Sequence, residues 1–199
     1  AAIESGLPQN EALKTIESAL RAGNKSPLPP KNPPILPKQK TYSKKDRALT
    51  DMGNAERFAD MYRHTVKYCP QKKKWLFFNG VHWQWDSIGE IYQKAKEVVR
   101  SIYKEAYQIR DQKQRETIAE WARKSESKQK IEAMLFLAQS EDDIPVLPSE
   151  LDQDPCLLGV ENGVLDLRCG ELVQPDASKL ITKNTHTVFN PSKKDPLWD

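Results

Sequence analysis

The sequence lacks several features on which common classes of protein depend. Its 199 residues include three cysteines, Cys69, Cys156 and Cys169, and no two of them share a C-x-x-C spacing. An odd number of unpaired cysteines predicts neither a disulfide framework nor a zinc site. No apolar run approaches the roughly 20 residues that span a bilayer, and the N-terminus lacks the pattern of a signal peptide. We therefore expect a soluble, cytoplasmic protein without a membrane partner.

Catalytic motifs are missing as well. None of the eight glycines belongs to a G-x-x-x-x-G-K-[ST] loop, and no G-x-S-x-G elbow occurs. The three histidines, His64, His82 and His186, are scattered without metal-ligand spacing. An acidic loop is the simplest interpretation of Asp152, Asp154 and Asp166, although carboxylates are also the ligands of Mg²⁺. We expect no catalysis, no ATP hydrolysis and no bound metal in this chain alone.

What the sequence does contain is an uneven distribution of charge. Residues 25 to 47 hold seven Lys and Arg against one Asp, whereas residues 141 to 176 hold ten Asp and Glu against one Arg. The whole-chain net charge of +3 conceals this difference. The first segment attracts phosphates and the second repels them.

The chain divides into three parts. Residues 1–25 predict a helix, with apolar residues at helical spacing over 9–22. Residues 26–48 predict a linker, because six prolines between Pro27 and Pro37 favour extended geometry. Its lysines are either solvated or in contact with nucleic-acid phosphates. Residues 49–199 form the main domain.

The main domain begins with a predicted helix over about 53–66. Thr50, Asp51 and Asn54 are candidate caps, and the apolar residues Phe58, Met61, Tyr62 and Val66 recur at helical spacing. Residues 73–86 then predict a β-hairpin around Asn79-Gly80. We expect its aromatic residues Trp75, Phe77, Trp83 and Trp85 to share one face, mostly as core. Lys72, Lys73 and Lys74 adjoin this hairpin, where an exposed ring could stack on a base.

The remaining patterns complete an α+β fold class. Helical periodicity covers 87–109, with Ser87 or Asp86 as cap, and 114–139, which we divide into two helices near 125–127. Residues 156–173, with a second Asn-Gly pair, predict β-hairpins, and 181–189 predict a further strand. The expected architecture is a helical centre flanked by small antiparallel β-hairpins, with an N-terminal helix and a proline-rich linker.

Four strings of the main domain resemble a known family. These are "LTDMGNAERF", "WLFFNGVHWQWD", "DQDPCLLGVENGVLDLRCGELV" and "VFNPSKKDPLW". In order and spacing they resemble the region upstream of the superfamily 3 helicase core in phage and plasmid primases, a module also found in the poxvirus primase-helicase. Residues 10 to 27 resemble the end of the primase-linked helical segment that precedes the module. The relatives continue toward a helicase phosphate-binding loop beyond the point where this sequence stops.

The resemblance implies a DNA-replication module of a phage or prophage primase-helicase, acting in the cytoplasm of a bacterial host. Its expected partners are single-stranded or forked DNA, its own primase and helicase domains, and further copies in a homo-hexamer. ATP and Mg²⁺ are expected only in the helicase domain. The alternatives are a structural spacer without DNA affinity and a metal-dependent nucleic-acid enzyme fragment.

Two sets of residues follow from these arguments. The candidate nucleic-acid-binding residues are Lys38, Lys40, Lys44, Lys45, Arg63, Lys72, Lys73, Lys74 and Trp75. The residues that match the family motifs, which we expect to be structural rather than catalytic, are Asp51, Gly53, Asn54, Arg57, Phe58, Asn162, Gly163, Asp166, Leu167 and Gly170.

Overall fold

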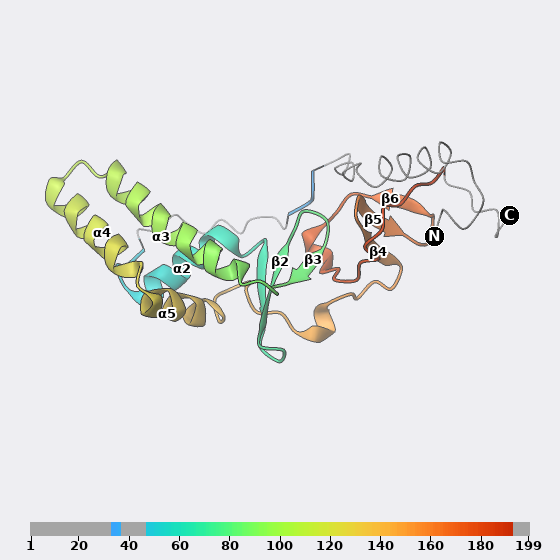
Figure 1. Cartoon of the computed structure of the whole chain (residues 1–199), viewed down its shortest axis with the longest axis horizontal. Coiled ribbons are helices and arrows are strands. Elements are labelled where there is room, and N and C mark those ends of the chain that lie inside the picture. Colours follow the sequence, from blue (N-terminus) through green and yellow to red (C-terminus); the bar gives the residue numbers. More distant parts are fainter. Residues whose placement is uncertain (1–32, 37–46, 193–199) are drawn as a thin grey trace, which may run out of the picture.

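The computed structural model describes residues 33–36 and 47–192 of the chain. The predicted helix at 9–22 and most of the linker, including Lys38, Lys40, Lys44 and Lys45, lie outside these residues. Figure 1 shows the helices gathered at one end, a first sheet in the middle and a second sheet at the other end. The α+β class is confirmed, with two three-stranded antiparallel sheets, ordered β1-β2-β3 and β4-β5-β6.

Four helices form the helical end: α2 (Asp51–Tyr62), α3 (Glu90–Gln108), α4 (Gln112–Ser125) and α5 (Lys128–Ala138). Three of them begin at a side chain that accepts a hydrogen bond from a first-turn amide, namely Thr50, Asp111 and Ser127. The predicted division of 114–139 is confirmed, since the chain leaves α4 at Ser125 and Ser127 caps α5. In α3 the Asp86 carboxylate accepts from four successive amides, those of residues 88 to 91.

The first helix differs from its prediction at both ends. It begins at Asp51 rather than near residue 53, because Thr50 is the cap, and it ends at Tyr62. Val66, assigned above to the helical stripe, instead opens β1 (Val66–Cys69), which pairs with β2 (Lys74–Phe78). Val66 follows Tyr62 by four residues, a spacing that fits a helix or a strand. The cross-strand pairing of Val66 with Phe77 places it in the strand.

The hairpin of β2 with β3 (Trp83–Trp85) is confirmed, but the single aromatic face is wrong. Phe78 pairs with Trp83 and Leu76 with Trp85, so the connection has four residues. Directly opposed residues share a face and neighbours alternate. Trp83 and Trp85 therefore lie on the face of Leu76, while Trp75 and Phe77 lie on the other face. The two faces serve different cores.

One core joins the helices to the first sheet. Phe58 and Val66, both fully buried, pack there with Ala95 and Val98 of α3 and with Met134 of α5. Trp75 and Phe77 close this core from the sheet. On the opposite face of the same sheet, a second core holds Leu76 and Trp83 with Val146 and Ala177. The first sheet thus connects the helical end to the C-terminal segments.

The second sheet comprises β4 (Leu157–Val160), β5 (Gly163–Asp166) and β6 (Glu171–Val173), as the hairpin patterns predicted. Two short 3-10 helices, η1 (Pro148–Glu150) and η2 (Ala177–Lys179), flank it. The strand predicted over 181–189 is absent from the described structure. This segment makes one isolated parallel bridge, Gly159 to Asn184, and the positive φ of His186 (55°) prevents a continuous ladder.

The part of the linker that is described lies against the C-terminal segments. Ile35 donates a backbone hydrogen bond to Pro175 and accepts one from Ala177. Closer to the domain, Arg57 of α2 donates to the carbonyl oxygens of Arg47 and Ala48. Across the described ranges, none of the helices combines the length and the apolar character needed to cross a membrane.

Candidate nucleic-acid interface

Three consecutive lysines precede and open the central strand of the first sheet. Lys72 and Lys73 belong to the turn between β1 and β2, and Lys74 is the first residue of β2. All three side chains are exposed. Because Lys73 adopts a left-handed conformation with φ of 51°, the turn changes direction at this residue. The result is a compact, positively charged end of the hairpin.

An aromatic ring lies under the first of these lysines. Lys72 Nζ lies 4.8 Å from the centroid of the Trp85 ring, within the range of a cation–π contact. This contact holds the ammonium group over β3 while the group stays exposed to solvent. Since sequence analysis grouped Trp85 with Trp75, it did not identify this pair; the cross-strand register places Trp85 on the other face.

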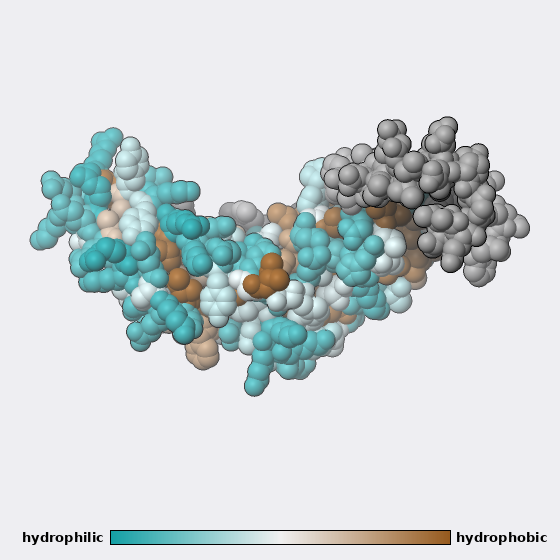
Figure 2. All heavy atoms as spheres, in the orientation of Figure 1, coloured by the Kyte–Doolittle hydropathy of each residue, from teal (hydrophilic) through white to brown (hydrophobic). Residues whose placement is uncertain are grey.

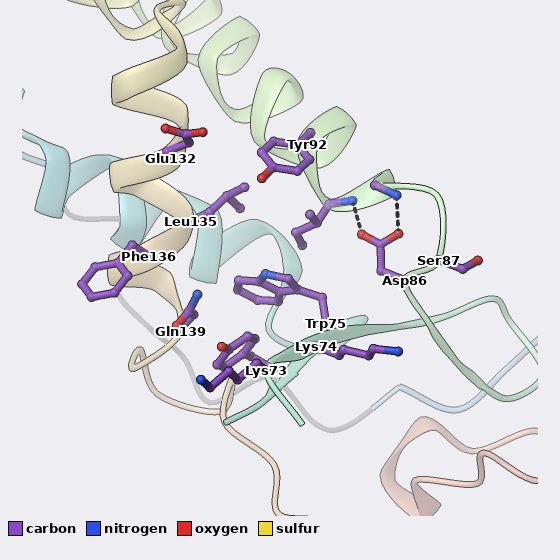
Figure 3. Close-up of a pocket in the computed structure, with 13 residues that line it drawn as sticks. Lys73, Lys74, Trp75, Asp86, Ser87, Tyr92, Glu132, Leu135, Phe136 and Gln139 are labelled. Carbon is purple, nitrogen blue, oxygen red and sulfur yellow. Dashed lines mark hydrogen bonds between the residues drawn. The ribbon is translucent and has the colours of Figure 1, made fainter. Parts of the chain in front are cut away.

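A groove of about 550 Å³ opens beside Lys73 and Lys74, between the first sheet and helices α3 and α5. Trp75 lies at its base, with Tyr92 of α3 and Phe136 of α5 on its sides (Figure 3). Tyr92 and Phe136 are large apolar residues with 47% and 71% of their surface exposed. Aromatic faces beside lysines suit a nucleic-acid strand, because rings stack on bases while ammonium groups bind phosphates.

Trp75 has a structural role as well as a surface one. Its ring packs edge-on against Phe58 at 5.8 Å between centroids, and it lies 4.9 Å from the ring of Tyr68. It is half-buried, so only part of the ring faces the groove. Of the groove's aromatic residues, Tyr92 and Phe136 are therefore more accessible than the Trp75 named from the sequence. Their signal in the sequence is weak, since a single aromatic residue off the apolar stripe of a helix is common.

Other groove residues are already engaged. Figure 3 shows the Asp86 carboxylate hydrogen-bonded to backbone amides at the start of α3. Its charge is directed at the helix N-terminus, where it is favourable. Glu132, also in the groove, lies 3.6 Å from Lys128 Nζ. The two carboxylates of the groove are thus partly neutralised within the domain, Asp86 by backbone amides and Glu132 by Lys128.

Arg63 does not belong to this surface. Its side chain is 4% exposed, and it bonds to the carbonyl oxygen of Ala59 and to the Asp60 carboxylate at 2.7 Å. The sequence placed it with the lysines because of its charge. The structure brings Lys73, Lys74 and Trp75 together at the groove. It places Lys72 over Trp85 on the other face of the sheet and leaves Arg63 apart from both.

The first family motif lies at the junction of α2 with α4 and α5. Asn54, fully buried, donates to the Ser125 hydroxyl at 3.0 Å and accepts from Trp121 Nε1 at 3.1 Å. Asp51 forms an ion pair with Lys130 at 2.9 Å. Thr50 is therefore the helix cap, whereas Asp51 and Asn54, the other candidates, make tertiary contacts.

Two further residues of the motif are fixed by close packing. Gly53 lies against Ala48, whose carbonyl oxygen would be 2.0 Å from an added Cβ atom. Arg57, 5% exposed, forms an ion pair with Glu105 of α3 at 3.1 Å in addition to its backbone contacts. Phe58 lies in the first core. No residue of this motif faces the groove.

The second motif shapes the second sheet. Asn162 and Phe189 exchange two hydrogen bonds, each 2.9 Å long, between the Asn162 amide and the Phe189 backbone. Gly163 opens β5 and pairs with Val160. Gly170, with φ of 70°, turns the chain from β5 into β6, and Leu167 is exposed beside that turn.

The carboxylates considered for Mg²⁺ have other partners. Arg168 bonds to Asp166 at 2.8 Å and to Asp154 at 3.0 Å. These hydrogen bonds from Arg168 lower the pKa of Asp166 below its ordinary value. Asp152 accepts hydrogen bonds from Thr182 and Lys183. Within residues 33–36 and 47–192, no cluster of three His, Cys, Asp or Glu side chains is arranged to hold a metal.

Fold and surface together define a small α+β module with an open groove between its first sheet and its helices, bordered by Lys73 and Lys74. Over residues 55–199 the chain matches the family described as D5 N terminal like. The chain therefore belongs to this family, whose domain is the N-terminal module of D5-like and phage primase-helicases and precedes the superfamily 3 helicase. This match confirms the family that the four strings of the sequence resemble. No curated protein matches the chain.

Proposed function

We propose that this domain serves DNA replication within a phage or prophage primase-helicase. It connects the primase to the superfamily 3 helicase, contacts single-stranded or forked DNA, and supports assembly of a homo-hexamer. The proposed setting is the cytoplasm of a bacterial host cell. ATP and Mg²⁺ are used by the helicase domain of the longer protein and not by this module.

The observation that carries the DNA contact is the pair of exposed lysines at the open groove, Lys73 and Lys74, with Lys72 exposed beside them on the other face of the hairpin. Exposed ammonium groups bind phosphates and release counterions, which makes affinity dependent on salt. Lys72 is held over Trp85 at 4.8 Å, while Lys73 and Lys74 line the groove with Tyr92. Charge and aromatic surface thus occur together, as single-strand binding requires.

Fluorescence anisotropy with a labelled single strand at several salt concentrations tests this contact. Replacing Lys72, Lys73 and Lys74 with Gln should weaken binding and reduce the slope of log K against log salt by about 2, because each single-strand phosphate contact contributes roughly 0.7. A control with the same change of charge replaces Lys124, Lys179 and Lys183, which are exposed and do not line the groove. Equal losses in both variants would contradict a defined site, and absence of binding by the native chain would favour the spacer.

The contribution to assembly rests on the acidic second half. Residues 141–176 carry ten acids against one Arg, opposite in charge to the linker. Repeated head-to-tail contacts between unlike surfaces close into a ring when the rotation permits. Charges of this kind orient subunits more than they hold them together. Light scattering of this chain and of the longer protein should give a monomer and a hexamer, and an intact hexamer after deletion of the domain would contradict the assembly role.

Metal-dependent cleavage is the remaining alternative. Asp154 and Asp166 are paired with Arg168, so a metal would have to displace a guanidinium group. ATPase and nuclease assays with Mg²⁺ on this chain and on the longer protein separate the two interpretations. Turnover by the 199-residue chain would support the enzyme interpretation.

A further inference from the structure

The acidic and basic residues of α3 differ in their partners. Its three glutamates all have partners within the domain. Glu90 lies 3.4 Å from Lys94, Glu97 accepts the Tyr62 hydroxyl at 2.5 Å, and Glu105 pairs with Arg57 at 3.1 Å. Two of these contacts are to α2. The glutamates are therefore used to pack the helix against the domain.

Three basic residues of α3 have no such role. Lys96, Arg100 and Lys104 are exposed, and within the described ranges none of them forms a salt bridge. They are spaced four residues apart, which places them on one face of an α-helix. Three like charges in a row repel one another slightly, so this arrangement contributes nothing to the stability of the helix.

Three tyrosines follow the same face. At 100° per residue, Tyr107 falls between Lys96 and Arg100, while Tyr92 and Tyr103 fall between Lys96 and the buried edge of α3 at Val99. Their exposed fractions are 47%, 37% and 88%. Tyr103 is oriented by a hydrogen bond of 2.9 Å to Glu126, the carboxylate that approaches this face. Exposed rings that recur along one side of a helix form a larger apolar surface than scattered single residues do, and such surfaces mark interaction sites.

We infer that this face of α3 binds a single strand of DNA, with the tyrosines stacking on bases and Lys96, Arg100 and Lys104 binding phosphates. The inference rests on the proposed function and extends it. Tyr92 belongs to both surfaces, because it also lines the groove beside Lys73 and Lys74. From Tyr92 to Tyr107 the face extends about 22 Å along the helix. We call it the α3 track.

The α3 track leads away from the sheets. Figure 1 shows α3 and α4 running together to the free end of the helical part, and Figure 2 shows a mainly hydrophilic surface over this part of the molecule. A strand held in the groove thus has a continuous route of alternating rings and cations along α3. Duplex DNA satisfies the cations alone, because its bases are stacked on each other and unavailable to the tyrosines. Cations together with exposed tyrosine rings therefore favour a single strand over a duplex.

The cationic part of the α3 track is tested by replacing Lys96, Arg100 and Lys104 with Gln in the full chain. Anisotropy is measured with single strands of about six and about 20 nucleotides, bracketing the usual site sizes. The long strand should lose affinity, with a salt slope smaller by about 2, while the short strand, held in the groove, should change little. The variant with Lys124, Lys179 and Lys183 replaced by Gln is the charge-matched control.

The aromatic part is tested by Tyr107→Ala, with Tyr107→Phe as the matched control that retains the ring. Loss of a stacked base should weaken long-strand binding at least about 5-fold in the Ala variant and leave the Phe variant close to native. Because Tyr107 is 88% exposed, its removal should leave the melting temperature unchanged. A duplex of the same length should bind both variants equally.

The outcomes separate this inference from the proposed function. If the α3 variants bind the long strand as the control does, while the variant of Lys72, Lys73 and Lys74 loses both strands, the inference fails and the groove stands. If long-strand binding depends on α3 but not on those three lysines, the groove assignment fails and the α3 track stands. Equal sensitivity of duplex and single strand to the loss of Tyr107 would overturn the choice of a single strand.

Discussion

Asn54 and Ser125, which lie 71 residues apart in the sequence, are joined by a hydrogen bond of 3.0 Å in a site where neither is exposed. Asn54 also accepts from Trp121 Nε1, so a single amide joins α2 to the end of α4. A buried amide is an unfavourable group unless its hydrogen bonds are made. This amide makes bonds through both its oxygen and its nitrogen.

Replacing Asn54 with Ala should lower the free energy of unfolding by about 1 to 3 kcal/mol, because Ser125 and Trp121 then lose their partner in a buried site. Urea denaturation followed by tryptophan fluorescence measures the change. Ser140→Ala removes a hydroxyl that bonds to the Leu137 carbonyl oxygen at the surface and should have a much smaller effect. Equal effects of the two substitutions would contradict this role of Asn54.

Gly53→Ala should destabilise the domain although Ala is the better helix former by roughly 1 kcal/mol. An added Cβ atom would lie 2.0 Å from the carbonyl oxygen of Ala48, so the backbone before α2 has to move. Thermal unfolding is the measurement. Met52→Ala, at an exposed position in the same turn, is the control and should change the melting temperature little. A gain in stability for Gly53→Ala would contradict the close approach.

Arg57→Met should release the segment before α2 from the helix. Arg57 donates hydrogen bonds to the carbonyl oxygens of Arg47 and Ala48, and a bond to a charged group contributes about 1.5 to 3 kcal/mol. We expect lower stability in urea and faster proteolysis at Arg47 or Lys45. Glu105→Gln removes the ion pair with Arg57. The hydrogen bonds from Arg57 to the backbone remain, because Glu105 takes no part in them. This substitution should preserve the resistance of this segment to proteolysis.

Stability should decrease as the pH falls from 7.5 to 5.5. Burial lowers the pKa of His82, and burial followed by the charge of Lys67 lowers the pKa of His64. In the unfolded chain both titrate near the ordinary value of about 6.5, so below it the unfolded state binds more protons than the folded state. The stabilisation is complete above about pH 6.5 and is lost toward the lower folded pKa values.

Urea titrations across this pH range should show a smaller dependence in His82→Gln than in the native chain. His82 is 4% exposed and contacts Gln84 and Asn184, so Gln retains polar contacts there without taking up a proton. His186→Asn, at an exposed position of positive φ, is the control and should keep the native dependence. An unchanged slope in His82→Gln would rule out His82 as the source.

Local patterns predicted the elements whose neighbours in space are also neighbours in sequence. The helices α3 to α5 follow from periodicity, and the division near Ser127 follows from its capping chemistry. Val66 was misplaced because its position is set by Phe77, 11 residues away. Trp85 was assigned to the wrong face because the face depends on the register of the hairpin. The length of the connection around Asn79 sets this register, and the residue pattern does not reveal that length.

The candidate site was predicted in part for the same reason. Lys72, Lys73 and Lys74 are consecutive, so their clustering needs no tertiary structure. The sequence did not single out Lys96, Arg100 and Lys104, since only the fold shows that Glu97 and Glu105 turn toward α2 and leave these three residues unpaired with them. Arg63 was included on charge alone, and its burial beside Asp60 depends on the packing of the helix end.

The linker is attached to the domain at two places. Ile35 is bonded to the backbone beside Asp176, and Arg47 is held by Arg57 in the helical part. The two attachments are separated by ten residues of the sequence, so they can lie at most about 40 Å apart. The linker therefore acts as a second tether between the two ends of the module. Tension applied to the chain before Ile35 would load its bonds to Pro175 and Ala177 before the bonds of Arg57, so the C-terminal segments would be displaced before the helices.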